Sequence, residues 1–234
     1  MKEELKILAL IPARKGSKRL PGKNIKKFCG KPLIAWTIDA SLSSKYVNKT
    51  VVSTDCQDIA KVSMEFGADV PFIRPSHLAT DTATTVDVIF HALKSLQDKG
   101  ENFSHLLLLQ PTSPLRTFDD INSSIDALIK SEANAIYSVC EVEHSPLWSN
   151  TLPKDKSFDG FLNDEIIGVR SQDLPKYYRL NGAIYLVKIS ELKKNKKLHN
   201  IKPGFAYIMD NKTSIDIDDE IGFKLASLLM ESML

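Results

Sequence analysis

The sequence predicts an α/β fold in which a mostly parallel sheet carries helices on both faces. Short apolar runs alternate with amphipathic segments through residues 1–142. The runs are apolar at nearly every position, which is typical of strands covered on both sides. Alternation of strands and helices favours parallel pairing. Strands are expected at residues 7–11, 50–53, 106–109, 135–139, 181–187, 205–209 and 214–217.

Helices are expected between these strands. Pro32 favours the start of the first helix, because proline suits a first turn, and Gly67 favours the end of the second. The later helices are expected at residues 56–66, 85–96, 118–130 and 219–230. The apolar side of the last one is expected to consist of Ile221, Leu225, Leu228 and Leu229. The basic residues 193–197 are interpreted as a solvated loop.

This alternation breaks between residues 143 and 180. The stretch contains Pro146, Pro153, Pro175 and Asp159-Gly160 and shows little helical periodicity. A stretch of about 40 residues without a core pattern is uncommon inside a compact domain. We therefore interpret residues 143–180 as an excursion that packs on another subunit. It is inserted in one domain that consists of residues 1–142 and 181–234.

Composition excludes several classes of protein. The 234 residues carry a net charge of +2, whereas a general nucleic-acid binder is usually basic overall. No apolar run approaches the ~20 residues of a membrane span. Cys29, Cys56 and Cys140 are widely spaced and odd in number, and they are interpreted as free thiols in a reducing compartment. The N-terminus lacks the layout of a signal peptide, so the protein is expected to be cytoplasmic, without nucleic-acid or membrane partners.

A basic loop follows the first expected strand. Residues 6–38 contain nine basic residues and no acidic one. Such a stretch repels itself unless an anion neutralises it. Gly16 and Gly22 allow close backbone approach, Ser17 donates a hydroxyl, and Arg14 and Lys23 supply charge. The loop therefore predicts a phosphate site, with a plain solvated basic loop as the alternative.

Acidic residues gather near the end of the chain. Asp216 and Asp218 alternate with isoleucines, so in an extended chain both carboxylates project from one face. Magnesium commonly takes one or two carboxylates together with phosphate oxygens. Capping of the following helix is the alternative for Asp218 and its acidic neighbours, but it does not account for Asp216.

A phosphate site and a two-carboxylate metal site together predict chemistry on a nucleoside triphosphate. The sequence has no glycine-lysine followed by serine or threonine at P-loop spacing, and no G-x-G-x-x-G fingerprint. An ordinary P-loop ATPase and a dinucleotide-dependent dehydrogenase are therefore not favoured.

Over nearly its whole length the chain resembles the N-acylneuraminate cytidylyltransferases, also called CMP-sialic acid synthetases. Five blocks in this order carry the resemblance: residues 12–24, Arg74-Pro75 with residues 78–83, residues 109–116, residues 181–185 and residues 214–218. The first block alone is shared more widely among nucleotidyltransferases. The resemblance implies a Rossmann-like nucleotidyltransferase fold and a homodimer with shared active sites.

The resemblance also implies a reaction. The anomeric hydroxyl of a nine-carbon 2-keto sugar acid attacks the α-phosphorus of CTP, and pyrophosphate leaves. Arg14 and Lys23 are expected to face the leaving group, and Asp216 and Asp218 to hold Mg²⁺. Nucleotide-binding residues are expected to be Ala13, Arg14, Ser17, Lys23, Asn24, Arg74, Ala83 and Thr85.

Further residues are assigned to the sugar acid by the same resemblance. They are Gln110, Thr112, Ser113, Arg170, Gln172 and Asn181. Arg170 is expected to reach the substrate carboxylate across the dimer interface, although relatives often read arginine-arginine-glutamine where this chain has Arg170-Ser171-Gln172. Turn chemistry is the alternative for Gln110 and for Asn181. Arg116 is interpreted as securing the following helix and lies outside the expected site.

One departure bears on the sugar acid. Sialic-acid-specific relatives can carry two phenylalanines near the 5-acyl group, and this chain has His199-Asn200 there. A polar pair does not make the same apolar wall, so legionaminic or pseudaminic acid is an alternative acceptor. Two other functions stay open: a nucleotidyltransferase acting on Kdo or a sugar 1-phosphate, and a non-catalytic nucleotide-binding protein.

Overall fold

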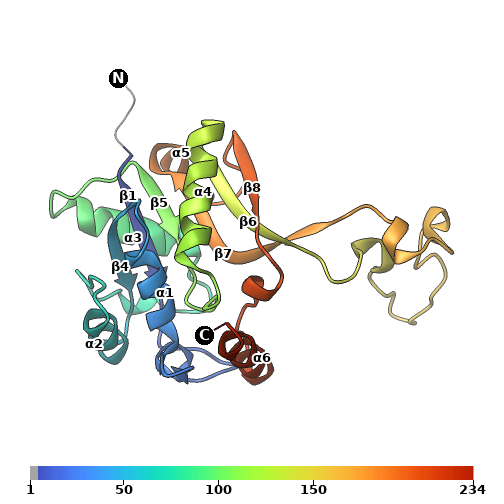
Figure 1. Ribbon diagram of the computed structural model, residues 1–234, viewed down its shortest axis with the longest axis horizontal. Coiled ribbons are helices and arrows are strands. Elements are labelled where there is room, and N and C mark those ends of the chain that lie inside the picture. The colour runs from blue at the N-terminus through green and yellow to red at the C-terminus, as the bar shows by residue number, and fades with distance from the viewer. Residues whose placement is uncertain (1–4, 234) are drawn as a thin grey trace.

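A six-stranded sheet runs through the centre of the protein (Figure 1) in the order β4-β1-β5-β7-β6-β8. The computed structural model describes residues 5–233. The strands are β1 (Ile7–Pro12), β4 (Val47–Ser53), β5 (His105–Leu108), β6 (Ala135–Glu141), β7 (Tyr178–Lys188) and β8 (Gly204–Ile208). Among the described strands of this sheet, only β7 runs antiparallel to its neighbours. The predicted mostly parallel sheet is confirmed.

Helices cover both faces of this sheet. The helices α1 (Leu33–Leu42), α2 (Gln57–Glu65) and α4 (Phe118–Ser131) pack on one face, and α3 (Thr85–Gln97) and α5 (Ile189–Asn195) pack on the other. Alternate residues of β1 feed the two cores: Ile7, Ala9 and Ile11 the first, Leu8 and Leu10 the second. This two-sided burial explains why the strand is apolar throughout.

Two helices that border the functional site begin with capping boxes. The Thr84 hydroxyl accepts a hydrogen bond from the Asp87 backbone N–H and the Asp87 side chain accepts one from the Thr84 backbone, which fixes the start of α3. Thr117 and Asp120 do the same for α4. Reciprocal caps satisfy amides that the first turn leaves free. The loops that precede α3 and α4 therefore have fixed ends.

The last helix, α6 (Glu220–Glu231), packs against residues from the first part of the chain. Its Phe223, Ala226 and Met230 pack with Phe28 and with Ile217 in a third cluster. Phe28 belongs to a hairpin of β2 (Lys27–Phe28) and β3 (Lys31–Pro32), which the sequence did not predict. The basic loop that predicts a phosphate site (residues 13–24, below called the phosphate loop) and the acidic segment 214–220 (below called the acidic tail) thus share one small core.

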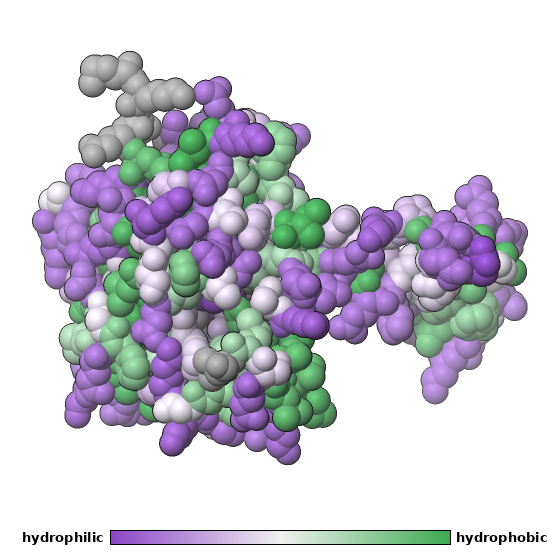
Figure 2. All heavy atoms as spheres, in the orientation of Figure 1, coloured by the Kyte–Doolittle hydropathy of each residue, from purple (hydrophilic) through white to green (hydrophobic). Residues whose placement is uncertain are grey.

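The predicted apolar side of this helix is wrong. Ile221, Leu225 and Leu228 are 78%, 47% and 67% exposed, and Figure 2 shows hydrophobic side chains at the surface over α6. Leu229 is only partly buried against the third cluster. Apolar residues lie on more than one side of α6, so the position of the hairpin decides which side is covered.

Two other predicted elements differ. Residues 214–217 form no strand; a 3-10 helix, Lys212–Ser214, precedes an irregular segment. The backbone N–H of Ile217 bonds to the carbonyl of Thr112 at 2.8 Å, so a loop rather than a strand holds this segment. Residues 193–197 are not simply a loop, since α5 extends to Asn195 because Ile189 and Leu192 are buried against the sheet.

Between β6 and β7 the chain leaves the body as a long arm (Figure 1). No residue between 143 and 180 is buried. The arm contains the 3-10 helices Pro146–Trp148, Asp164–Ile166 and Ser171–Asp173. Leu152, Phe158 and Ile167 are exposed on it, and Figure 2 shows hydrophobic side chains on its surface. Among residues 5–233, no helix has the length and apolar character needed to span a membrane.

Candidate functional site

A cavity of about 520 Å³ opens beyond the ends of β1 and β5. Pro12 and Leu108, which end these strands, form part of its wall. Ligands of open α/β sheets bind at this edge. Ten of the predicted site residues line it: Arg14, Ser17, Lys23, Asn24, Arg74, Ala83, Thr85, Gln110, Thr112 and Asp218.

The phosphate loop is folded back on itself. It leaves β1 at the buried Ala13, whose N–H bonds to the carbonyl of Ser53 at 2.9 Å. Gly22 then adopts φ +67° before a 3-10 helix, Lys23–Ile25, a conformation that favours glycine. The Asn24 side-chain amide donates to the carbonyl oxygen of Arg14 at 3.0 Å. This bond closes the loop, and Arg14 and Lys23 both face the cavity.

Lys23 connects this loop to the acidic tail. Its Nζ donates to the carbonyl oxygen of Ile217 at 2.5 Å and lies 3.9 Å from Oδ1 of Asp218. Burial lowers the pKa of Lys23, and the nearby Asp218 and Asp216 oppose that shift. Residues from the first and last parts of the chain therefore meet at one end of the cavity.

The alternation predicted for the acidic tail persists without a strand. Ile215 and Ile217 both pack into the third cluster, and the carboxylates between and after them lie near Lys23. Burial raises the pKa of Asp216, and the Asp218 charge adds to this, whereas a hydrogen bond with Thr112 opposes it. Asp218 accepts a hydrogen bond from Nη1 of Arg19 at 2.8 Å.

The donor set suits a magnesium ion that also binds phosphate. Within residues 5–233 no three His, Cys, Asp or Glu side chains form a metal-binding group. Magnesium often takes one or two protein carboxylates and completes its shell with phosphate oxygens and water. Asp218 lines the cavity, whereas Asp216 lies outside its lining. The two carboxylates are close enough for the charge of Asp218 to raise the pKa of Asp216, and two carboxylates that repel each other fit this requirement.

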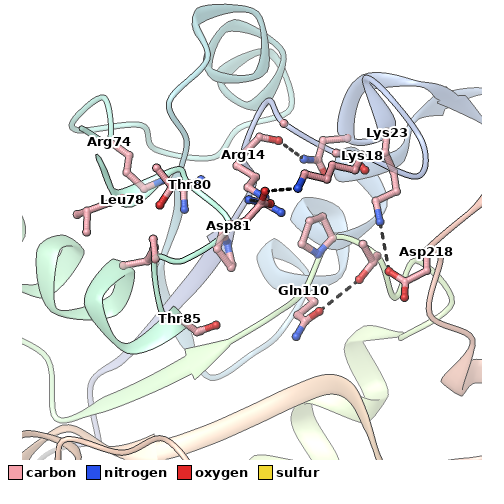
Figure 3. A pocket seen from close by; sticks show the side chains of 18 of the residues that line it. Arg14, Lys18, Lys23, Arg74, Leu78, Thr80, Asp81, Thr85, Gln110 and Asp218 are labelled. Atoms are coloured by element: carbon pink, nitrogen blue, oxygen red, sulfur yellow. Dashed lines mark hydrogen bonds and ion pairs between the residues drawn. The ribbon is translucent and has the colours of Figure 1, made fainter. Parts of the chain in front are cut away.

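The cavity also contains buried polar atoms that make no hydrogen bond among the described residues. Figure 3 shows Arg74 and Leu78 far from Lys23 and Asp218. Arg74 is only 4% exposed, and its Nε and Nη2 make no hydrogen bond among the described residues; its nearest carboxylate oxygen, Oδ1 of Asp55, is 3.8 Å away. Oδ1 of Asn24, which follows Lys23 in the 3-10 helix, has no hydrogen-bond partner among residues 5–233 either. Leaving a buried polar group unpaired costs about 1–3 kcal/mol, so these atoms point to a polar ligand.

Three charged residues of the cavity were missing from the predicted site. Asp81 binds Arg14 and Lys18, with N···O distances of 2.9 and 2.5 Å. Arg19 binds Asp218. The three residues, Lys18, Arg19 and Asp81, lie inside the motifs that predicted the site, residues 12–24 and 78–83. Their position in these motifs is the signal that could have found them.

Comparisons with known proteins show the family of the chain. A family profile described as cytidylyltransferase matches residues 8–225. The chain belongs to the cytidylyltransferase family. It is 37% identical to the CMP-N,N'-diacetyllegionaminic acid synthase of Legionella pneumophila over 97% of both chains. It is 33% identical to the pseudaminic acid cytidylyltransferase of Campylobacter jejuni over 77% of this chain and 78% of that one.

A solved structure shares the fold of this cytidylyltransferase. It is a CMP:2-keto-3-deoxy-manno-octonic acid synthetase in complex with CTP, matched with a TM-score of 0.73 and 17% identity over 98% of this chain and all of that one. The predicted Rossmann-like nucleotidyltransferase fold, the resemblance and the enzyme class are therefore confirmed.

A second cavity, of about 780 Å³, adjoins the first in this cytidylyltransferase. Thr85, Leu108 and Gln110 line both cavities. The second is further walled by apolar and aromatic side chains and by a polar rim: Val86, Phe90, Tyr185, Leu198, Lys196, Lys197, His199 and Asn200. The rings of Tyr185 and His199 meet edge to face at 5.4 Å. Gln110 thus stands where the two cavities join.

Several predicted sugar residues of the cytidylyltransferase lie outside both cavities. Asn181 is buried, and its amide bonds to Ser138, to the Ala183 N–H and to Ser214. The structure gives it a different task, which is to hold these segments together. Ser113 is also buried outside the cavities. Arg170 and Gln172 lie on the arm, where Arg170 pairs with Asp173 at 2.8 Å, so the fold of one chain does not bring them to its own cavity.

Proposed function

We propose that this cytidylyltransferase transfers CMP from CTP to the anomeric hydroxyl of a nonulosonic acid. A bond forms between that oxygen and the α-phosphorus, the bond from the α-phosphorus to the bridging oxygen breaks, and pyrophosphate leaves. The hydroxyl proton passes to a carboxylate beside the phosphates, that of Asp216 or that of Asp218. The polar lining of the first cavity carries this proposal: it combines Arg74 and Asn24, whose buried polar atoms lack hydrogen bonds among the described residues, with a cluster of cations near Asp216 and Asp218.

The atoms of Arg74 and Asn24 that lack hydrogen bonds suit a cytosine base. Cytosine presents an exocyclic amino donor and ring acceptors. A guanidinium is a donor only, and an amide oxygen is an acceptor. Arg74 therefore binds the ring acceptors and Asn24 accepts from the amino group. Uracil, with a carbonyl in place of the amino group, leaves Asn24 unpaired, so the site favours CTP.

The cationic end suits the triphosphate. Charge develops on the leaving pyrophosphate, and fixed donors directed at that charge lower the barrier. Arg14, Lys18 and Lys23 line this end together with Ser17. Lys23 is the most constrained of these cations, because its buried Nζ is anchored to Ile217.

Asp216 and Asp218 are the residues that would hold Mg²⁺ there. A bound magnesium ion would bridge phosphate oxygens and neutralise part of their charge. Without it, burial and mutual repulsion raise the pKa of Asp216. Thr112 orients that carboxylate through its hydrogen bond, and the Ile217 N–H fixes the backbone between the two aspartates.

The second cavity is the proposed binding site of the sugar acid. It joins the first at Gln110, so a bound acceptor lies beside the nucleotide. Phe90, Tyr185 and Leu198 give an apolar wall, while His199 and Asn200 give hydrogen-bonding groups. That mixture suits acylamino substituents, which have an apolar methyl and a polar amide. Because a relative of 37% identity is named for N,N'-diacetyllegionaminic acid, a diacylamino acceptor of this kind is the preferred substrate.

The arm is proposed to pack on a second copy of the chain. No residue between 143 and 180 is buried, although Leu152, Phe158 and Ile167 are large and apolar. Covering such side chains favours association. Arg170 and Gln172 would then approach the sugar cavity of the other copy, where a guanidinium suits a carboxylate. Sedimentation that shows a fully active monomer would remove this part of the proposal.

The deciding experiment is a substrate matrix. The protein is incubated with magnesium, each of the four nucleoside triphosphates and a panel of nonulosonic acids and Kdo, and the products are identified by mass spectrometry. A CMP-sugar from CTP and a diacylamino nonulosonic acid is expected. Product formed best with UTP or GTP would reject the proposal, and absence of product from every pair would favour a non-catalytic nucleotide-binding protein.

A further inference from the structure

Asp81 occupies the centre of the cationic end of the first cavity. Its Oδ1 lies 2.9 Å from Nη1 of Arg14, and its Oδ2 lies 2.5 Å from Nζ of Lys18. Figure 3 shows its carboxylate directed at these two side chains. The two hydrogen bonds, Lys18 first and Arg14 second, lower the pKa of Asp81. Both carboxylate oxygens are thus bound to cations that the proposed function assigns to phosphate.

The loop that carries Asp81 is fixed on both sides of this residue. Thr80 bonds to the carbonyl of His77 at 3.3 Å, and Thr84 caps α3. The carbonyl of Ala79 accepts a further bond from Arg14 at 3.5 Å. The loop therefore keeps Asp81 beside the phosphate loop, while the carboxylate itself is half exposed.

The contacts of Asp81 compete with those that a triphosphate would make. Arg14 uses the same guanidinium nitrogen for Asp81 and Ala79, and a phosphate oxygen at that nitrogen would lie against the carboxylate. Like charges at such distances repel. We propose that Asp81 is an exchangeable counterion of the phosphate loop, which the phosphates of CTP displace and which recovers Arg14 and Lys18 as pyrophosphate leaves.

This role, which rests on the proposed function, explains why an acidic residue lies among the cations of the phosphate loop. Residues 6–38 contain nine basic residues and no acidic one, so the empty loop needs a charge from elsewhere. Asp218 and Glu220 supply part of it to Arg19 and Lys26, and Asp81 supplies the part that holds Arg14 and Lys18 in place. The same carboxylate competes with bound anions, so it weakens their binding and speeds their release.

Pyrophosphate affinity tests the proposal directly. Calorimetric titration with inorganic pyrophosphate, in buffer without divalent metal, is compared for the wild type and for Asp81→Asn, Asp81→Glu and Asp69→Asn. Asp69 is the matched control, because it pairs with Lys49 at 3.2 Å, is similarly exposed and lies outside both cavities. Because exposed ion pairs are individually weak, Asp81→Asn is expected to bind pyrophosphate about threefold to tenfold more tightly.

The controls keep the outcome decisive. Asp81→Glu retains the charge and is expected to bind like the wild type, as is Asp69→Asn. Unchanged or weaker binding by Asp81→Asn overturns the proposal, and so does tighter binding by Asp81→Glu, since the loop and not the charge would then be responsible. These titrations need no turnover. If no sugar acid accepts CMP, the proposed function fails while the pyrophosphate result still decides the role of Asp81.

Discussion

The side chain of Lys23 donates a hydrogen bond to the carbonyl oxygen of Ile217, 194 residues further along the chain, at 2.5 Å. One end of this bond follows the first strand, and the other precedes the last helix. Because Lys23 and Ile217 are both buried, the bond is shielded from water and strengthened. It fixes the distance between the cationic loop and the two aspartates that face it.

Lys23→Gln is expected to affect both stability and turnover. The carbonyl of Ile217 loses its charged donor, so the free energy of unfolding should fall by about 1–3 kcal/mol. Loss of a fixed cation beside the leaving group should lower kcat by roughly 10²-fold. Denaturant titration and steady-state kinetics measure the two effects. Lys27→Gln changes an exposed lysine of the same segment and should leave both quantities near wild type. A Lys23→Gln enzyme with wild-type kcat would contradict the phosphate role.

Asp218→Asn is expected to abolish turnover while CTP still binds. The variant keeps the shape of the side chain but removes a carboxylate that would hold magnesium. Asp219→Asn is its matched control, because Asp219 caps α6 through a bond from the Gly222 N–H at 2.8 Å and asparagine caps equally well. Both variants change the net charge equally. Turnover at several magnesium concentrations and CTP titration separate the two roles, and equal activity of the two variants would refute the metal role of Asp218.

The strands of the sheet could be predicted because strands buried on both faces consist of consecutive apolar residues. Ile7 to Ile11 are all fully buried, and this pattern is typical of a strand with a layer on each face. The side of α6 that packs could not be predicted in this way. Ile221 and Phe223 lie on different sides of one helix, and the hairpin that contains Phe28, remote in the sequence, covers only the second.

The site was predictable where it follows strand ends and unpredictable where it depends on pairing in space. Arg14 follows β1, and Gln110 follows β5, so both reach the same edge of the sheet. Asp81 lies in an expected motif, but its pairing with Lys18 depends on how two loops meet. Asn181 was assigned to the sugar through the resemblance. Nothing in the sequence shows that its amide faces inward to Ser138 and Ser214.

Asp216→Asn is expected to stabilise the metal-free protein while it inactivates the enzyme. Burial raises the pKa of Asp216 above its ordinary value of 3.8, so the folded state holds this proton more tightly than the unfolded chain does. Stability contributed by the protonated form is therefore lost as the pH rises through the folded pKa. Asp216 keeps an exposed surface, so the effect is small: at neutral pH the asparagine variant avoids a partly desolvated charge that Asp218 repels, and thermal melting without metal should show a slightly higher Tm. The gain should vanish at pH values below the ordinary pKa, and a gain that is independent of pH would exclude this explanation.

Asn181→Ala distinguishes a structural residue from one that binds the sugar. The change removes the acceptor for the Ser138 hydroxyl and the Ala183 N–H, and the donor to Ser214, all of which are buried. The free energy of unfolding is expected to fall by about 1–3 kcal/mol for the groups left unpaired, and Asn211→Ala, at an exposed position in the following loop, should leave it unchanged. In the fraction of Asn181→Ala that remains folded, the KM for the sugar acid should match the wild type, because the amide lines neither cavity. A large rise in that KM without a loss of stability would restore Asn181 to the sugar site.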